Sequence, residues 1–230
     1  MSGIDSIPGN ALARELVKLG GNHMSVSEDR ESVAPAVQPA AAAAPVADPG
    51  PLGLAAFALT TFLLSAFNAR WMSGNSAGTA FLGYAFAYGG IAQLLAGMWE
   101  FRNRNVFGAT AFSSYGGFWI GLFVWIRSVP NALTATGHDL GWILLAFAIF
   151  NTYMLLLSAQ VNLAVFTVFL TLELTEILLA VGNFTSSPGW TQFGGYLGII
   201  TAAAAWYTSA AGVSNGLNGK LRIPVGRPLI

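Results

Sequence analysis

Two acidic residues near the end of a long apolar segment are the side chains best suited to chemistry in this chain. Glu173 and Glu176 lie three positions apart in FLTLELTEILLAV, so on a helix they share one face. Two carboxyl groups this close in a medium of low dielectric constant do not readily ionise together, and a carboxyl that gains and loses a proton at membrane depth can relay protons. Glu173 and Glu176 are therefore proton-relay candidates. The alternatives are that they bond hydroxyl groups of neighbouring helices or lie nearer the membrane surface.

Neutral hydrogen-bonding side chains lie inside the other apolar segments. Hydroxyl and amide groups can hydrogen-bond an oxyanion without holding it as strongly as lysine or arginine would, which suits passage better than storage. Each of them could instead form a hydrogen bond between helices, but as a set they favour a polar path. The set comprises Thr60, Thr61, Asn68, Tyr88, Gln93, Thr110, Ser113, Ser114 and Tyr115.

Residues for catalysis or metal binding are scarce. Cysteine is absent, the two histidines are His23 and His138, and neither lies within an apolar segment. No pair of nucleophile and base is visible, so we expect no enzyme activity, no metal and no cofactor. Ten basic and ten acidic residues give a formal net charge of zero, which offers no reason to expect a nucleic-acid partner.

The elements that must position these residues are membrane-spanning helices. At 54% hydrophobic and 9% charged residues, the 230-residue chain has too little polar surface for an ordinary soluble domain. About 20 apolar residues cross the hydrocarbon core, and the segments Pro51–Ala69, Gly78–Trp99 and Val106–Ile126 each meet that requirement. We therefore expect an all-α membrane protein.

The second half of the chain predicts three further spans. Leu140–Leu172 is free of charge but too long for one crossing, and a polar cluster inside it predicts a turn between a fourth and a fifth span, at Ser158, Gln160 and Asn162. The fifth span continues to about Val181, and a loop over Asn183–Trp190 precedes a sixth span at Trp190–Gly212. The total is six.

Charge placement agrees with six spans. An even count puts most basic residues on one side, namely Arg14, Lys18, Arg30, Arg102, Arg104, Lys220, Arg222 and Arg227. The other side holds Arg70 and Arg127. By the positive-inside rule we expect a multi-pass protein of the cytoplasmic membrane with both termini in the cytoplasm.

The regions outside the spans differ in composition from the rest. Residues 1–47 form an Ala/Pro-rich tail that cannot bury enough surface to order itself, although Ala11–Leu19 could make a short amphipathic helix. His23-Met24 has the form of a cloning junction, which would make residues 1–23 an added leader. We expect a six-span domain over 48–215 and a cytoplasmic tail over 216–230.

Glycine spacing within the spans predicts close helix packing. Gly117-x-x-x-Gly121 and Gly194-x-x-x-Gly198 place small residues one turn apart, which lets helix backbones approach each other in lipid.

Several blocks of the sequence resemble one family of membrane proteins. Asp48-Pro-Gly-Pro-Leu-Gly-Leu-Ala-Ala-Phe57 resembles the NPAPLGL signature of the acetate uptake transporter family, also called the GPR1/FUN34/YaaH or succinate-acetate permease family. Further blocks match in the same order: Tyr88-Gly-Gly-Ile-Ala-Gln93, Asn105 to Trp119, and Ala180-Val-Gly-Asn183. The resemblance covers roughly residues 48–225 and leaves out the N-terminal tail.

The resemblance implies a homohexamer in which each six-helix protomer has its own central pore for acetate and related short carboxylates, often with proton coupling. It places an apolar constriction at Phe57, Tyr115 and Leu172, although each could equally be packed core. Together with the polar residues above, it suggests a substrate path lined by Pro51, Leu52, Gly53, Leu54, Thr60, Thr61, Gln93, Thr110, Ser114 and Asn183.

The acidic residues depart from the family pattern. If Leu172 faces the pore, Glu176 is only about 40° away around the helix and faces the same pore, whereas Glu173, about 100° away, faces a neighbouring helix. An ionised Glu176 would repel a carboxylate, which favours a protonated side chain, passage of the neutral acid or an altered selectivity. Asp48, where the signature has asparagine, adds negative charge at a pore mouth, and Gly50 in place of alanine should matter little.

The expected function is therefore transport of acetate and related short-chain carboxylates, succinate as a further candidate, coupled to protons. The expected partners are the carboxylate, protons, the lipid bilayer and further copies of the chain. Two alternatives remain: a passive channel for an anion or small solute, and a non-transporting membrane sensor or assembly protein.

Overall fold

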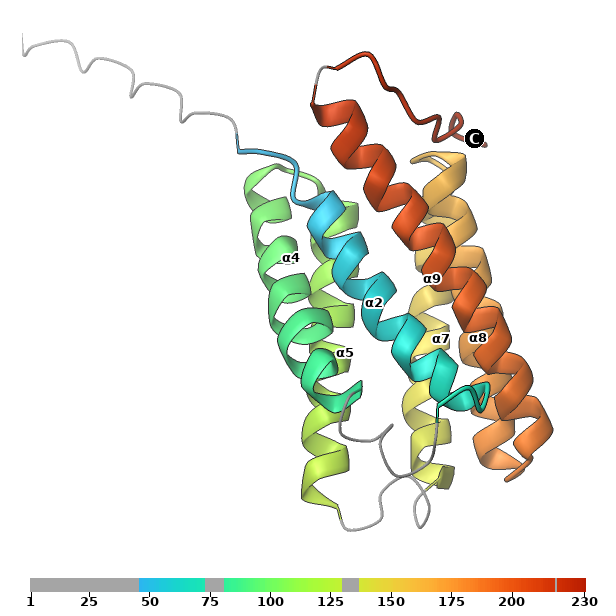
Figure 1. The fold of residues 1–230 in the computed structure, drawn as a ribbon. Coiled ribbons are helices and arrows are strands. Elements are labelled where there is room, and N and C mark those ends of the chain that lie inside the picture. The colour runs from blue at the N-terminus through green and yellow to red at the C-terminus, as the bar shows by residue number, and fades with distance from the viewer. Residues whose placement is uncertain (1–45, 73–80, 130–136, 218) are drawn as a thin grey trace, which may run out of the picture. The chain divides into compact units, whose positions relative to one another are not determined.

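The computed structural model describes residues 46–72, 81–129, 137–217 and 219–230. The expected N-terminal tail, its amphipathic helix and the proposed leader lie almost wholly outside these residues. In the described part of the chain the regular elements are helices, and six helical segments are long and apolar enough to cross a membrane (Figure 1). The all-α, six-span prediction is confirmed.

The six spans have these bounds. The first is α2 (Gly50–Asn68), and the second, Phe81–Arg102, contains the π-helical segment η1 (Ala85–Ala92) followed by α4 (Gln93–Arg102). The others are α5 (Val106–Ser128), α7 (Gly137–Ser158), α8 (Leu163–Phe184) and α9 (Pro188–Gly216).

Two expected boundaries near the fifth and sixth spans are wrong. Asn183 is helical, not part of a loop, and its Nδ2 donates to the carbonyl oxygen of Leu179 one turn earlier, at 2.8 Å. The sixth helix begins at Pro188, where a missing N–H costs nothing in the first helical turn, and it continues to Gly216. These helices are therefore longer than the hydrophobic pattern alone predicts.

The predicted turn between the fourth and fifth spans is confirmed. The fourth helix ends at Ser158, and Asn162 caps the next helix by accepting a hydrogen bond from the N–H of Val165 at 2.9 Å. Asn105 caps α5 in the same way, accepting from the N–H of Gly108 at 3.1 Å. Such caps satisfy N–H groups that a helix start leaves free, so they define where α5 and α8 begin.

The two glycine motifs behave differently. A Cβ added at Gly198 of α9 would lie 2.1 Å from Ser65 Oγ of α2, and one at Gly194 would lie 2.8 Å from Leu179 of α8, so this motif does pack closely. At Gly117 and Gly121 of α5 an added Cβ would meet no atom of the described chain within 4 Å. Of these two motifs, therefore, only the one in α9 brings helices of the described chain together.

The C-terminal segment, residues 219–230, folds back over the junction of α7 and α8 (Figure 1). The N–H of Ala164 donates to the carbonyl oxygen of Val225 at 2.9 Å, and the N–H of Leu229 donates to that of Ala159 at 2.7 Å. The expected tail beyond residue 215 is thus held against the helices.

Three helices share one direction. The first, third and fifth spans, α2, α5 and α8, all begin at the end of the bundle where the C-terminal segment lies (Figure 1). Residues at matching depths on these three helices can therefore meet around one axis.

Candidate functional site

A small buried cavity lies where α2, α5 and α8 meet. Phe57, Tyr115 and Leu172, the residues expected to form a constriction, all line it, together with Glu176. Its volume is about 30 Å³. A cavity of this size has room for no more than a few water molecules, so the passage is closed to a carboxylic acid at this level.

A larger cavity lies on each side of this constriction. One, of about 260 Å³, is lined by Leu54, Ala111 and Phe169, which lie about one helical turn before the constriction residues on α2, α5 and α8. The other, of about 720 Å³, is lined by residues further along the same helices, Leu64, Leu122 and Leu179. We call these the narrow and the wide vestibule. The three helices thus carry a vestibule, a constriction and a second vestibule in order along one axis.

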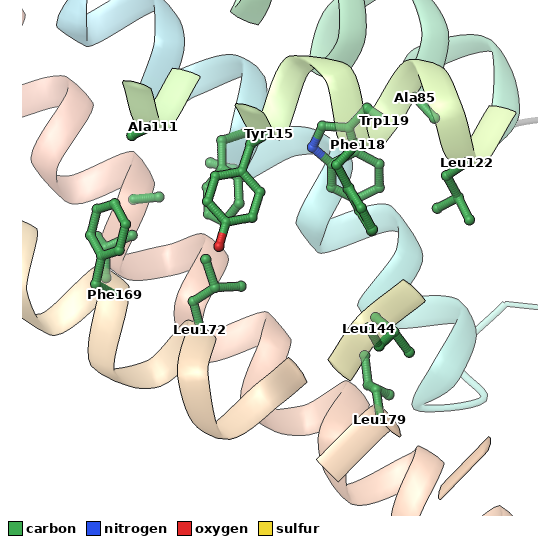
Figure 2. Close-up of a cluster of buried hydrophobic side chains, with 14 of the residues drawn as sticks. Ala85, Ala111, Tyr115, Phe118, Trp119, Leu122, Leu144, Phe169, Leu172 and Leu179 are labelled. Carbon is green, nitrogen blue, oxygen red and sulfur yellow. The ribbon is translucent and has the colours of Figure 1, made fainter. Parts of the chain in front are cut away.

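Aromatic packing holds the constriction together. The rings of Phe57 and Tyr115 meet edge to face with centroids 5.6 Å apart, and Phe147 and Phe150 of α7 lie at 5.7 and 5.6 Å from Tyr115. Figure 2 shows Tyr115 reaching from α5 with its hydroxyl oxygen directed toward Leu172. The level of the constriction is therefore largely aromatic and aliphatic, and its polar groups are the hydroxyl groups of Tyr115, Thr61, Ser65 and Thr175 and the carboxyl group of Glu176.

Two of these polar groups, on Tyr115 and Glu176, belong to a connected network between α5, α7 and α8. The Tyr115 hydroxyl lies 3.0 Å from Asn151 Oδ1 and 3.3 Å from Glu176 Oε1. Asn151 Nδ2 donates to Glu173 Oε2 at 2.8 Å, and Thr152 Oγ1 lies 2.8 Å from Glu173 Oε1. Glu173 therefore faces α7, and Glu176 faces the constriction, as their spacing from Leu172 predicts.

The network includes a residue that sequence reasoning missed. Asn151 is fully buried at the centre of α7. The signal that could have identified it is its position, since an amide in the middle of the charge-free segment LLAFAIFNTYMLLL needs a partner at membrane depth.

The narrow vestibule contains two carboxyl groups. A Cβ on Gly50 would lie 3.0 Å from Asp48 Oδ1 and 3.4 Å from Glu100 Oε1, so both carboxyl groups lie beside Gly50. Asp48 Oδ1 accepts the N–H of Gly50 at 2.8 Å, and Glu100 Oε2 is buried with no hydrogen-bond partner among the described residues. Asp48 and Glu100 thus both line this mouth, and the negative charge expected there stays a prediction.

Four of the ten expected path residues line the axis. Pro51 and Leu54 line the narrow vestibule, Thr61 lines the constriction and Asn183 lines the wide vestibule. Thr61 Oγ1 is buried without a partner in the described chain, so it is free to bond a passing group.

The other six lie elsewhere. Leu52 is exposed on the outer surface, and Gly53 faces the ring of Phe112, because a Cβ there would lie 2.7 Å from the ring. Thr60 Oγ1 donates to the carbonyl oxygen of Ala56 at 2.8 Å. The remaining three are Gln93, which is buried, Thr110, which is half-buried and lines none of the three cavities, and Ser114, which lines a separate groove between α5 and α7.

Comparison with known proteins gives relatives with named activities. The sequence profile of the GPR1/FUN34/yaaH family matches residues 31–227. Acetate permease A of Emericella nidulans is 41% identical over 198 residues, covering 78% of this chain and 65% of that protein. The succinate-acetate/proton symporter SatP of Escherichia coli K12 is 33% identical over 183 residues, covering 79% of this chain and 96% of that protein.

A solved structure shares the fold. The structure of the bacterial acetate channel SatP superposes with a TM-score of 0.72 at 32% sequence identity, covering 79% of this chain and 99% of that one.

Proposed function

Since the chain belongs to the GPR1/FUN34/yaaH family, we propose that it transports acetate and related short-chain carboxylates, succinate among them, across the membrane. The observation that carries this proposal is the closed apolar constriction between two vestibules, lined by Phe57, Tyr115 and Leu172. A passage built in this way suits a small solute that is stripped of most of its water.

The constriction selects by size and by the cost of desolvation. Since its cavity of about 30 Å³ has room for no more than a few water molecules, the rings of Phe57 and Tyr115 must separate before a carboxylic acid passes. Burying a carboxylate without partners is costly, and few groups at this level can bond it, the hydroxyl groups of Tyr115 and Thr61 among them. Small acids that need few partners are therefore favoured.

The first turns of α2, α5 and α8 line the narrow vestibule. The N-terminal ends of helices favour anions, so a carboxylate is drawn to this level. Asp48 and Glu100 oppose that attraction. We propose that these two carboxyl groups tune how strongly the vestibule holds an anion, so that substrate is released readily.

Glu176 favours coupling to protons over a passive channel. An ionised carboxylate beside the constriction would repel a carboxylate substrate, whereas a protonated one would not. Substrate and proton would then pass the constriction together, with Glu173 and Glu176 as the proton relay. A passive channel lacks this dependence, and a non-transporting sensor or assembly protein shows no flux.

We place the protein in the cytoplasmic membrane with both termini in the cytoplasm. In the described chain Arg102, Arg104 and the basic residues of 219–230 lie at the end of the bundle where α2 begins, and Arg70 and Arg127 lie at the other. We also propose a homohexamer in which every protomer has its own pathway. The open face of α5 around Gly117 and Gly121 offers a surface for a neighbouring copy.

Labelled acetate uptake into liposomes containing the purified protein tests the proposal. We expect uptake that rises when a proton gradient, acidic outside, is imposed. Uptake that ignores the gradient would favour the passive channel, and no uptake above empty liposomes would refute transport. The variant Leu52→Ala, on the outer surface of α2, is a control that should behave as the native protein does.

A further inference from the structure

The hydroxyl group of Tyr115 has one hydrogen and two acceptors within reach. Asn151 Oδ1 lies at 3.0 Å and Glu176 Oε1 at 3.3 Å from the same oxygen, and all three side chains are buried. Tyr115 can donate to only one of them. The second contact is a hydrogen bond only if the other side chain donates to Tyr115.

The orientation of the Asn151 amide is determined by its other contacts. Its Nδ2 lies 2.9 Å from the carbonyl oxygen of Phe169, which can only accept, and 2.8 Å from Glu173 Oε2. The amide nitrogen must therefore point away from Tyr115, so Asn151 offers Tyr115 an acceptor and no donor. Both contacts of Tyr115 are hydrogen bonds only when Glu176 carries a proton and donates it.

We propose that Asn151 is a positioning residue that makes the direction of the Tyr115 hydroxyl follow the proton on Glu176. When Glu176 is protonated, it donates to Tyr115, and Tyr115 donates to Asn151. When Glu176 is ionised, the negative acceptor takes the Tyr115 hydrogen and Asn151 Oδ1 loses its partner. The direction in which the Tyr115 hydroxyl group points at the constriction thus changes with one proton. The use of such a change rests on the proposed transport function.

The two glutamates differ in how well their oxygen atoms are partnered. Glu173 has a partner on each oxygen, Asn151 Nδ2 at 2.8 Å from Oε2 and Thr152 Oγ1 at 2.8 Å from Oε1. Glu176 Oε2 is buried with no partner in the described chain. A buried carboxylate with an unpartnered oxygen is costly, so the proton belongs on Glu176.

The groups that can influence the proton on Glu176 come from each packed element. Glu173 lies on the same helix, Tyr115 approaches from α5, and Tyr153 of α7 is near Tyr115 on the exposed side. From α2, Thr61 and Ser65 line the cavity, and the residues of α2 that the structure shows there carry no ionisable group. On α9, Thr201 contacts Thr175 of α8, and neither is ionisable.

Opposite effects of two substitutions test the inference. Asn151→Leu removes the competing acceptor and leaves the Tyr115 hydrogen to the ionised Glu176, so the pH midpoint of acetate uptake should fall by about one unit. Tyr115→Phe removes the donor to the ionised form, so the midpoint should rise by a similar amount. Thr152→Val is the matched control, because the Thr152 hydroxyl contacts Glu173 and the carbonyl oxygen of Ala148 but neither Tyr115 nor Glu176, so its loss should shift the midpoint much less.

The comparison uses all variants at the same concentration of acetate, so that the titration of the substrate itself cancels. Glu176→Gln should abolish the pH-dependent transition in acetate uptake, both in the native protein and when it is combined with Asn151→Leu or Tyr115→Phe. Midpoints that move in the same direction in Asn151→Leu and Tyr115→Phe, or that do not move, would overturn the inference. A residue that only packs the helices would lower rates in both variants without opposite shifts.

A spectroscopic measurement works even for a variant that transports nothing. The infrared absorption of protonated carboxyl groups, titrated with pH in the reconstituted protein, should lose one band in Glu176→Gln and keep it in Glu173→Gln. The pH midpoint at which this band disappears should fall in Asn151→Leu and rise in Tyr115→Phe, as for acetate uptake. If native protein shows the band but no acetate uptake, the proposed function fails and the inference about Asn151 stands; if the band follows Glu173, the inference fails by itself.

Discussion

Truncating the aromatic side of the constriction should relax selection by size. Phe57→Ala removes a ring that is 4% exposed and that meets Tyr115 edge to face at 5.6 Å, so the cavity of about 30 Å³ gains the volume of that ring. One methylene group in a tight apolar site changes discrimination about 10-fold to 200-fold. The uptake of butyrate relative to acetate should therefore rise at least about tenfold.

The assay is competition between labelled acetate and unlabelled acids of increasing length in liposomes. Phe62→Ala is the matched control, because Phe62 lies on the same helix but packs on Trp206, with ring centroids 5.5 Å apart, and lines none of the three cavities. Loss of the Phe57 ring should also lower stability by about 3–5 kcal/mol, so folding is checked by thermal unfolding in detergent. An unchanged acid ratio, or the same change in Phe62→Ala, would refute the placement of the constriction.

Three further predictions follow from the packing and from the network. Gly198→Ala should lower stability by about 1–3 kcal/mol in thermal unfolding, because its Cβ would lie 2.1 Å from Ser65 Oγ, and adding Ser65→Ala should restore part of the loss. No restoration would mean that the clash lies elsewhere. Glu176→Gln should make acetate uptake independent of a proton gradient, and a gradient response equal to that of the native protein would exclude Glu176 as the coupling group. Deleting residues 219–230 should lower the Tm, since each lost hydrogen bond to α7 and α8 is worth about 0.5–1.5 kcal/mol, and an unchanged Tm would show that the segment adds no stability.

Much of the fold could be predicted from hydrophobic length and from polar interruptions. A helix must satisfy its own backbone in lipid, so each apolar segment of sufficient length predicts one crossing, and the cluster around Asn162 divides the longest of them correctly. Helix ends were less accurate. Asn183 resembles a loop residue by composition, but its side chain bonds the preceding turn and the helix continues past it.

The site could be predicted only in part, because composition does not specify how a helix is rotated. Thr60 and Thr61 are adjacent and chemically identical, yet Thr60 bonds its own backbone at the contact with η1, where an added Cβ on Gly89 would lie 2.6 Å away, and Thr61 faces the constriction. The spacing from Leu172 did predict that Glu176 and Glu173 face different neighbours.

The sequence by itself determined that the chain crosses the membrane six times, because hydrocarbon thickness and backbone bonding leave few other options, and that two carboxyl groups lie three positions apart in the fifth apolar segment. Only the tertiary structure decided how those two groups differ. Glu173 meets donors from α7, whereas Glu176 meets one shared hydroxyl group and an apolar cavity. The physical reason is that packing decides which hydrogen-bonding groups each carboxyl group meets. Asn151, from a helix whose sequence is mostly apolar, donates to Glu173 and competes with Glu176 for the hydrogen of Tyr115.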